Sequence, residues 1–128
     1  MKISSYKQLT VWQKSYELVK EVYKLTARLP KSETYGLASQ IQRSAVSIPS
    51  NIAEGQQRRN IKEYVQFLGI SQGSAAELDT QLMIMKDIYD IDTSEQLLTT
   101  QEIQKMLYAL SEKLTITYNL KPKTSSQS

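Results

Sequence analysis

Cysteine and histidine are both absent from the 128-residue sequence. Without cysteine, the chain forms no disulfide, no thiolate metal site and no cysteine nucleophile, and such a composition is typical of a reducing cytoplasm. Without histidine, it has no Ser-His-Asp triad, no histidine-ligated zinc and no Glu-x-x-His ligands of the kind found in di-iron bundles. Carboxylates at a catalytic spacing are missing as well. The sequence therefore predicts no metal, no cofactor and no enzymatic activity.

Long apolar runs are also missing. No stretch approaches the roughly 20 apolar residues that a membrane-spanning helix needs, and the N-terminal segment MKISSYKQLTVWQK lacks the apolar core of a signal peptide. We therefore expect a cytoplasmic protein with no membrane partner. The length is sufficient for one domain that buries its own core.

The net charge of +3 is unevenly distributed. Residues 1–64 contain 11 Lys and Arg against 5 Asp and Glu, whereas residues 65–128 contain 5 against 8. A basic half can indicate an anionic partner, but solvated helix faces often carry charges of both signs, and the charge balance alone favours this second explanation.

Apolar residues at steps of three and four predict four helices with short connections. The first is expected to start at a capping box formed by Thr10 and Gln13 and to end near Leu29. Its apolar positions cover an arc of roughly 200°, twice the stripe of about 100° that a surface helix needs. We therefore expect it to be buried on two sides, either inside one bundle or with one face against another subunit. Trp12 is expected to anchor the core rather than to stack on a nucleic-acid base.

The second predicted helix contains Pro49 within a continuous apolar periodicity. Because proline lacks an N–H and its ring crowds the carbonyl of Ala45, we expect a kink there, and a break after Ile48 is the alternative. Ser32 or Thr34 can cap the start of this helix.

Three polar or small residues near the end of the second helix are interpreted as structural. Gly55 offers a left-handed stop for the helix. Asn51 and Glu54 are expected to bond to backbone at the kink or to the neighbouring helix.

The third helix is expected to begin at a capping box formed by Asn60 and Glu63 and to continue for about 30 residues. Gly69 and Gly73 lie on one side of it. Since each glycine costs roughly 1 kcal/mol inside a helix, we expect the small-residue side of the second helix to approach closely there.

The fourth helix is expected to start at a cap formed by Asp92 or Thr93 and to end near Asn119. The predicted fold is therefore all-α, an up-down-up-down antiparallel four-helix bundle over residues 1–119 with a kinked second helix. Residues 120–128 are polar and are expected to form a disordered tail.

Several segments together resemble one protein family: LTVWQK at 9–14, YGL at 35–37, RSAVSIPSNIAEG at 43–55, EY at 63–64 and GS at 73–74. The chain resembles small bacterial four-helix-bundle proteins encoded within 23S rRNA intervening sequences, which are similar to the accessory variability determinant of diversity-generating retroelements. The resemblance extends from about Tyr6 to Tyr118. One departure is at Gln42-Arg43, where relatives often carry two arginines.

The resemblance implies a ring-like homopentamer with a basic surface and no established enzymatic activity. For the retroelement relatives, it also implies binding to nucleic acid and to a reverse transcriptase.

From the residues themselves, a nucleic-acid-binding oligomer is our first hypothesis. Arg58, Arg59 and Lys62 cluster at the start of the third helix, where free N–H groups and the positive end of the dipole favour phosphate, and Arg43 is a lesser contributor. The alternative for Arg58 and Arg59 is local pairing with carboxylates such as Glu54. In a ring, each charge would be repeated, so binding to RNA or DNA would be multivalent and salt-sensitive.

The second hypothesis is a protein-interaction adaptor or scaffold, for example for a reverse transcriptase. In that case the basic surface would be incidental to the function.

Overall fold

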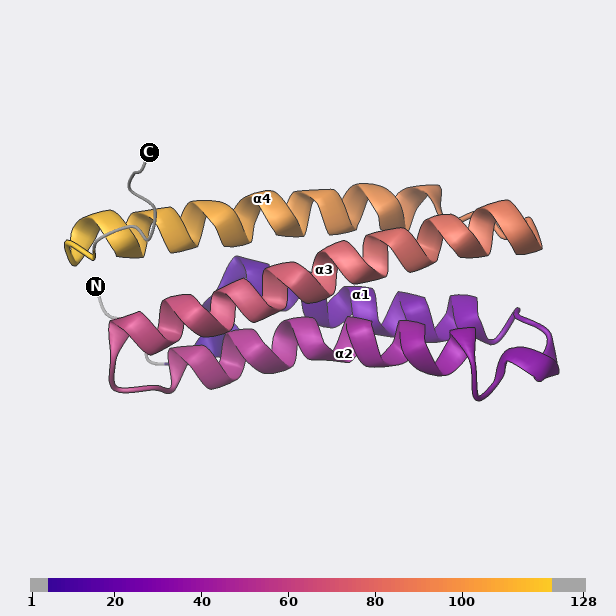
Figure 1. Cartoon of the computed structure of the whole chain (residues 1–128), viewed down its shortest axis with the longest axis horizontal. Helices are drawn as coiled ribbons and strands as arrows, with labels where there is room; N and C mark the ends of the chain where they lie inside the picture. The colour runs from indigo at the N-terminus through magenta and orange to yellow at the C-terminus, as the bar shows by residue number, and fades with distance from the viewer. Residues whose placement is uncertain (1–4, 121–128) are drawn as a thin grey trace, which may run out of the picture.

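The computed structural model describes residues 5–120, and every regular element in this range is helical (Figure 1). The four long helices are α1 (Thr10–Thr26), α2 (Leu37–Gln56), α3 (Ile61–Tyr89) and α4 (Ser94–Thr117). Two short 3-10 helices precede α1 and α2, namely η1 (Tyr6–Gln8) and η2 (Lys31–Glu33).

The long helices lie side by side along the longest axis, and each runs back along its predecessor (Figure 1). The contact between α2 and α3 is the most extensive, and the contact between α1 and α4 is the smallest of the neighbouring pairs. This arrangement confirms the predicted all-α four-helix bundle. The predicted tail covers residues 120–128. Of these, Leu120 is described, and residues 121–128 lie outside the described residues. Between residues 5 and 120, every helix is too short or too polar to cross a bilayer.

One apolar core extends along the bundle and receives side chains from all four helices. Its members follow the three- and four-residue steps of each helix, as the sequence periodicity predicts. The largest fully buried apolar side chains are Leu18, Val22, Ile41, Ile48, Ile52, Leu68, Leu78, Leu82, Met85, Ile103 and Leu107.

Helix α1 buries only one of its two apolar faces. Val11 and Leu18 are in the core, but Tyr16 and Tyr23 on the other face are 48% and 46% exposed. The expectation that α1 is buried on two sides is therefore wrong for a single chain, because α2 covers one face and α4 contacts α1 only lightly. Trp12 is half-buried at the edge of the core and stacks on Tyr16, with ring centroids 4.9 Å apart.

The starts of α3 and α1 are built differently. Asn60 is the N-cap of α3, and its side chain accepts a hydrogen bond from the Glu63 N–H at 3.2 Å, which confirms the predicted cap. The predicted capping box of α1 is wrong, because the N-cap residue is Leu9 and has no side-chain cap bond. The Gln13 amide instead donates to the Lys7 carbonyl at 2.8 Å, which ties α1 to η1.

The start of α2 is also capped by a residue other than the predicted ones. Glu33 accepts a hydrogen bond from the Leu37 N–H at 2.9 Å, so neither Ser32 nor Thr34 performs this role. A carboxylate fits this position because the first N–H groups of a helix are unpaired and carry its positive dipole end.

Thr93 is the N-cap residue of α4, but its side chain makes no cap bond. Of the two predicted residues, it is Asp92, one position earlier, whose side chain accepts a bond from the helix start. The Asp92 carboxylate accepts a hydrogen bond from the Ser94 N–H at 3.0 Å. Thr93 is fully buried, and its hydroxyl donates to the Leu82 carbonyl at 2.9 Å, which fixes the connection against α3.

Helix α2 continues through Pro49 from Leu37 to Gln56, so the alternative of a break after Ile48 is wrong. Two polar side chains bond to carbonyls just before the proline. The Ser71 hydroxyl donates to the Ile48 carbonyl at 2.9 Å, and the Asn51 amide donates to the Ser47 carbonyl at 2.8 Å. Neither bond reaches the Ala45 carbonyl, which is the one that loses its helical donor because Pro49 has no N–H. The kink angle stays a prediction.

Gly55, rather than Gly69 or Gly73, marks the close approach of α2 and α3. A Cβ at Gly55 would lie 2.7 Å from the Phe67 Cβ, whereas a Cβ at Gly69 or Gly73 would meet nothing within 4 Å. The predicted packing of Gly69 and Gly73 against α2 is therefore wrong, because α3 is rotated so that this side faces outward. The left-handed stop at Gly55 is wrong too, since no described glycine has a positive φ and α2 continues past Gly55.

Candidate nucleic-acid interface

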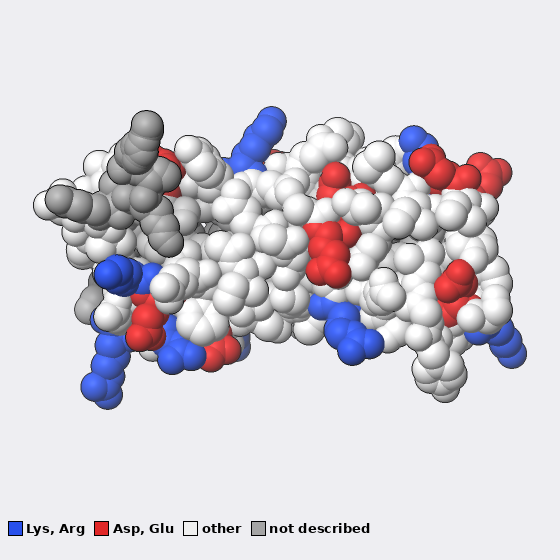
Figure 2. Space-filling model, viewed as in Figure 1, with Lys and Arg blue, Asp and Glu red and all other residues white. Residues whose placement is uncertain are grey.

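The turn between α2 and α3 brings together three of the four predicted nucleic-acid-binding residues. Arg58, Arg59 and Lys62 are all exposed at this end of the bundle. Figure 2 shows basic side chains gathered at this end, interspersed with acidic ones. Arg43 is not part of this group, because it lies roughly 20 Å away along α2 at 1.5 Å per residue.

Arg58 is held by neighbouring side chains. Its Nη2 lies 2.7 Å from a Glu54 carboxylate oxygen, and its Nη1 lies 3.7 Å from Glu63 on α3. The guanidinium also lies over the Phe67 ring, 4.7 Å from the centroid. Local pairing is therefore the correct interpretation of Arg58, and the side chain fastens the last turn of α2 to the first turns of α3.

Arg59 and Lys62 are different, since no carboxylate among residues 5–120 lies within ion-pairing distance of either. A shallow hollow of about 330 Å³ lies beside them and is lined by Gln57, Arg58, Arg59, Asn60 and Glu63. The N-terminus of α3, which is the positive end of its helix dipole, lies at this point next to Lys62. We call Arg59 and Lys62 the basic end.

Arg43 lies beside a separate cleft between α2 and α3. Its volume is about 310 Å³, and we call it the serine cleft. The cleft is lined only by polar side chains: Gln40, Arg43, Ser44, Ser47, Ser74 and Glu77. Figure 2 shows basic groups on α2 facing acidic groups on α3 about midway along this face. Spacing along the chain does not predict that Ser74 and Glu77 lie opposite Arg43, because their position depends on the rotation and register of α3.

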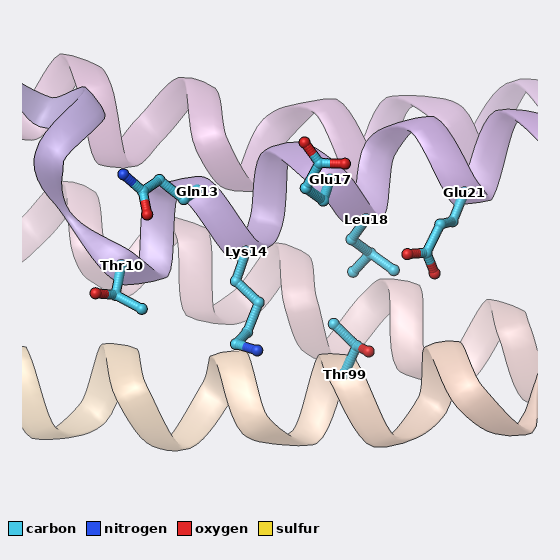
Figure 3. A pocket seen from close by; sticks show the side chains of 7 residues that line it. All are labelled: Thr10, Gln13, Lys14, Glu17, Leu18, Glu21 and Thr99. Atoms are coloured by element: carbon cyan, nitrogen blue, oxygen red, sulfur yellow. The ribbon is translucent and has the colours of Figure 1, made fainter.

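A third hollow, of about 350 Å³, lies between α1 and α4 (Figure 3). Its charged groups have partners. Lys14 pairs with Glu102 at 3.3 Å, and Glu21 accepts a hydrogen bond from Gln96 at 3.0 Å. Leu18 points into the hollow from α1 (Figure 3). The hollow marks the loosely packed seam between the two helices, and its lining carries one positive and two negative side chains.

The outer surfaces of α3 and α4 carry several exposed apolar side chains. The more exposed ones are Ile70, Met83, Ile88, Leu98, Tyr108 and Ile116, each between 49% and 73% exposed. Tyr35, between η2 and α2, is 96% exposed. The described part of the chain holds no group of three or more Asp and Glu side chains that fits a metal ion.

Residues 7–111 match a protein family described as 23S rRNA-intervening sequence protein. The fold is also similar to the crystal structure of a protein with unknown function from the S23 ribosomal protein family of Bacteroides thetaiotaomicron VPI-5482. That similarity has a TM-score of 0.72 at 24% identity and covers 80% of this chain and 95% of the other, so it supports the fold alone. No curated protein matches the chain significantly.

Proposed function

Because the chain belongs to the 23S rRNA-intervening sequence protein family, we propose that it is a non-enzymatic, oligomeric bundle that binds nucleic acid through the basic end. The observation that carries the proposal is that Arg58 has carboxylate partners while its neighbours Arg59 and Lys62 have none among the described residues. The partners of Arg58 are Glu54 and Glu63. Unpaired cations beside a helix start are suited to phosphate groups.

The binding would be independent of base sequence. Affinity of this kind comes from the release of counterions from the phosphate backbone, so it decreases as salt increases. Either RNA or DNA could bind to the basic end, since both have a phosphate backbone.

We further propose that the chain forms a homo-oligomer, and a pentamer is the expected form. Two exposed surfaces support this proposal. One is the outer face of α3, where Ile70 and Ile88 are exposed and Gly69 and Gly73 leave room for another backbone. The other is an apolar hollow of about 320 Å³ on α1 and α2, lined by Tyr6, Trp12, Tyr16, Val19, Val46, Pro49, Ser50 and Ala53. A ring would repeat the basic end in every subunit and make weak contacts multivalent.

The proposal is tested by measuring the binding of a fluorescent single-stranded RNA, and of the matching DNA, at several salt concentrations. We expect Arg59→Glu combined with Lys62→Glu to abolish binding. The matched control is Lys86→Glu combined with Lys105→Glu, which makes the same change in net charge on exposed residues elsewhere. Equal loss of binding in both double variants, or binding that ignores salt, would contradict the proposal.

The alternative is a protein-interaction adaptor, for example for a reverse transcriptase, as in the retroelement accessory proteins that the sequence resembles. The observation that favours it is the nearly complete exposure of Tyr35, because exposed aromatic residues often anchor protein interfaces. We expect Tyr35→Ala to weaken binding of such a partner and to leave nucleic-acid binding unchanged. We propose that the protein acts in the cytoplasm, where partners of either kind would be available.

A further inference from the structure

The serine cleft has hydrogen-bond donors that no described residue uses. Ser47 and Ser74 form one hydrogen bond between their hydroxyl oxygens at 2.7 Å, and the Asn51 amide donates to the Ser47 oxygen at 2.9 Å. The two serines have two hydroxyl hydrogens, and their mutual bond uses one of them. The other has no acceptor among residues 5–120.

Ser44 adds a second unused donor. Its side chain lines the cleft and the residue is only 5% exposed, yet its hydroxyl makes no hydrogen bond to another described residue. Among the described residues, the buried side-chain polar atom without a partner is the Gln81 Oε1, so the Ser44 hydroxyl reaches the surface of the cleft, where it can donate to a bound group.

Arg43 supplies a positive charge at the rim. Its Nη2 donates to the Ser39 hydroxyl at 3.0 Å, and no described carboxylate lies within ion-pairing distance. The guanidinium has five N–H donors in a fixed fork that suits phosphate geometry, so most of them remain available.

Glu77 lines the same cleft but does not pair with Arg43. The lining therefore carries one positive and one negative charge, together with several hydroxyl donors. Because these two charges balance, the lining offers no net positive charge to offset the larger desolvation cost of a doubly charged anion. The chemistry that fits is an oxyanion that accepts several hydrogen bonds and carries one charge.

We propose that the serine cleft binds one phosphodiester group, the singly charged phosphate of a nucleic-acid backbone, with Arg43, Ser44 and the Ser47–Ser74 pair as donors. The inference rests on the proposed function, because it assigns a second phosphate contact to the same ligand. Since the cleft lies roughly 20 Å from the basic end, a strand that contacts both would run along the α2–α3 face.

The test is an NMR titration of the full chain with dimethyl phosphate, a singly charged phosphodiester without a base or sugar. We expect the amide signals of Ser44 and Ser74 and the side-chain signal of Arg43 to shift. Arg43→Gln should abolish these shifts. Ser44→Ala, which removes a hydroxyl without a partner and is expected to fold normally, should weaken binding. No shift in the wild-type protein would overturn the proposal.

Glu77→Gln gives a result that a purely structural role would not produce. Removing the carboxylate should strengthen dimethyl phosphate binding by about threefold or more, because a repulsive charge is lost at close range. The matched control, Glu112→Gln, removes an exposed carboxylate on α4 and should leave the affinity unchanged. Equal affinity in the wild type and in Glu77→Gln would overturn the proposal.

Two further measurements separate this inference from the proposed function. Arg59→Gln should leave the Ser44 and Ser74 shifts with dimethyl phosphate unchanged, since the basic end is distant. With single-stranded DNA, Arg43→Gln should reduce the salt dependence of binding, and an unchanged salt dependence would overturn the link to nucleic acid. If Arg43→Gln changes the oligomeric mass and the wild type ignores dimethyl phosphate, the cleft is a subunit contact and the proposal fails.

Discussion

The phenol of Tyr89, at the end of α3, donates a hydrogen bond to the carboxylate of Glu33, 56 residues earlier in η2. The other carboxylate oxygen accepts the Leu37 N–H at the start of α2. One side chain therefore caps α2 and ties it to the far end of α3. The Tyr89 hydrogen bond, with a smaller contribution from Leu37, lowers the pKa of Glu33, and the same bond to Glu33 raises the pKa of Tyr89.

The first prediction concerns acid stability. Because the folded state lowers the pKa of Glu33, its ionised carboxylate stabilises the fold above the unfolded-state pKa, near 4.5. This contribution is lost as the pH falls through the lower, folded-state pKa. We expect Glu33→Gln to reduce stability at pH 7 and to reduce the loss of stability between pH 7 and pH 3, measured by thermal unfolding. A loss of stability in acid equal to that of the wild type would contradict the role of Glu33.

The second prediction compares two glycines. Gly55→Ala should lower the free energy of unfolding by about 1–3 kcal/mol, because the new Cβ would lie against Phe67 and force the helices apart. Gly69→Ala should raise the free energy of unfolding of the separate chain, measured at a concentration too low for assembly, by up to roughly 1 kcal/mol, because open space surrounds the site in one chain and alanine favours a helix. Urea unfolding of both variants measures the difference. Similar effects at the two positions would contradict the described packing.

The third prediction compares the effects of replacing Arg58 and Arg59 on stability and on nucleic-acid binding. Arg58→Gln removes two ion pairs and the contact with Phe67. We expect a stability loss of at most about 1 kcal/mol, since both ion pairs are solvent-exposed. Nucleic-acid affinity should change little, whereas Arg59→Gln should weaken binding with no change in stability. Thermal unfolding and binding assays on the same two samples give both comparisons.

The fourth prediction concerns Pro49. We expect Pro49→Ala to fold, to straighten α2 and to disturb assembly, because the proline interrupts the helix ladder and lines the apolar hollow on α1 and α2. A crystal structure of the variant and its mass by light scattering test both effects. An unchanged helix path with an unchanged mass would refute this prediction.

The fifth prediction concerns the oligomer. Light scattering at micromolar concentration should give about five times the 14.6 kDa mass of one chain. Ile70→Glu places a charge on the outer face of α3 and should reduce this mass while leaving helicity unchanged. A wild-type mass near 14.6 kDa would exclude the assembly.

The sequence predicts the helices well because their periodicity is local. The Asn60 cap is likewise a bond between residues three apart, so sequence spacing is sufficient to find it. The capping of α2 is not predictable in this way, since Glu33 depends on a turn in η2 and on Tyr89 at the far end of the bundle. The exposure of Gly69 and Gly73 depends on the rotation of α3, which only tertiary packing sets.

In the candidate site, too, local spacing predicts some features and tertiary packing determines the others. Spacing along the chain places Arg58, Arg59 and Lys62 together at one turn. It also offers the pairing of Arg58 with Glu54, four residues earlier, but it does not reveal the contact with Phe67, which reaches Arg58 from α3. The serine cleft combines residues about 30 positions apart, so local spacing along the chain cannot predict it.

The extensive contact between α2 and α3 also has a consequence for the order of folding. These helices are consecutive and joined by a short turn, so closing their contact costs little loop entropy. The contact between α1 and α4 joins distant parts of the chain and is small. We therefore expect the α2–α3 hairpin to be formed in the folding transition state and the α1–α4 seam to close last, so that substitutions at Ser71 slow folding while those at Lys14 mainly speed unfolding.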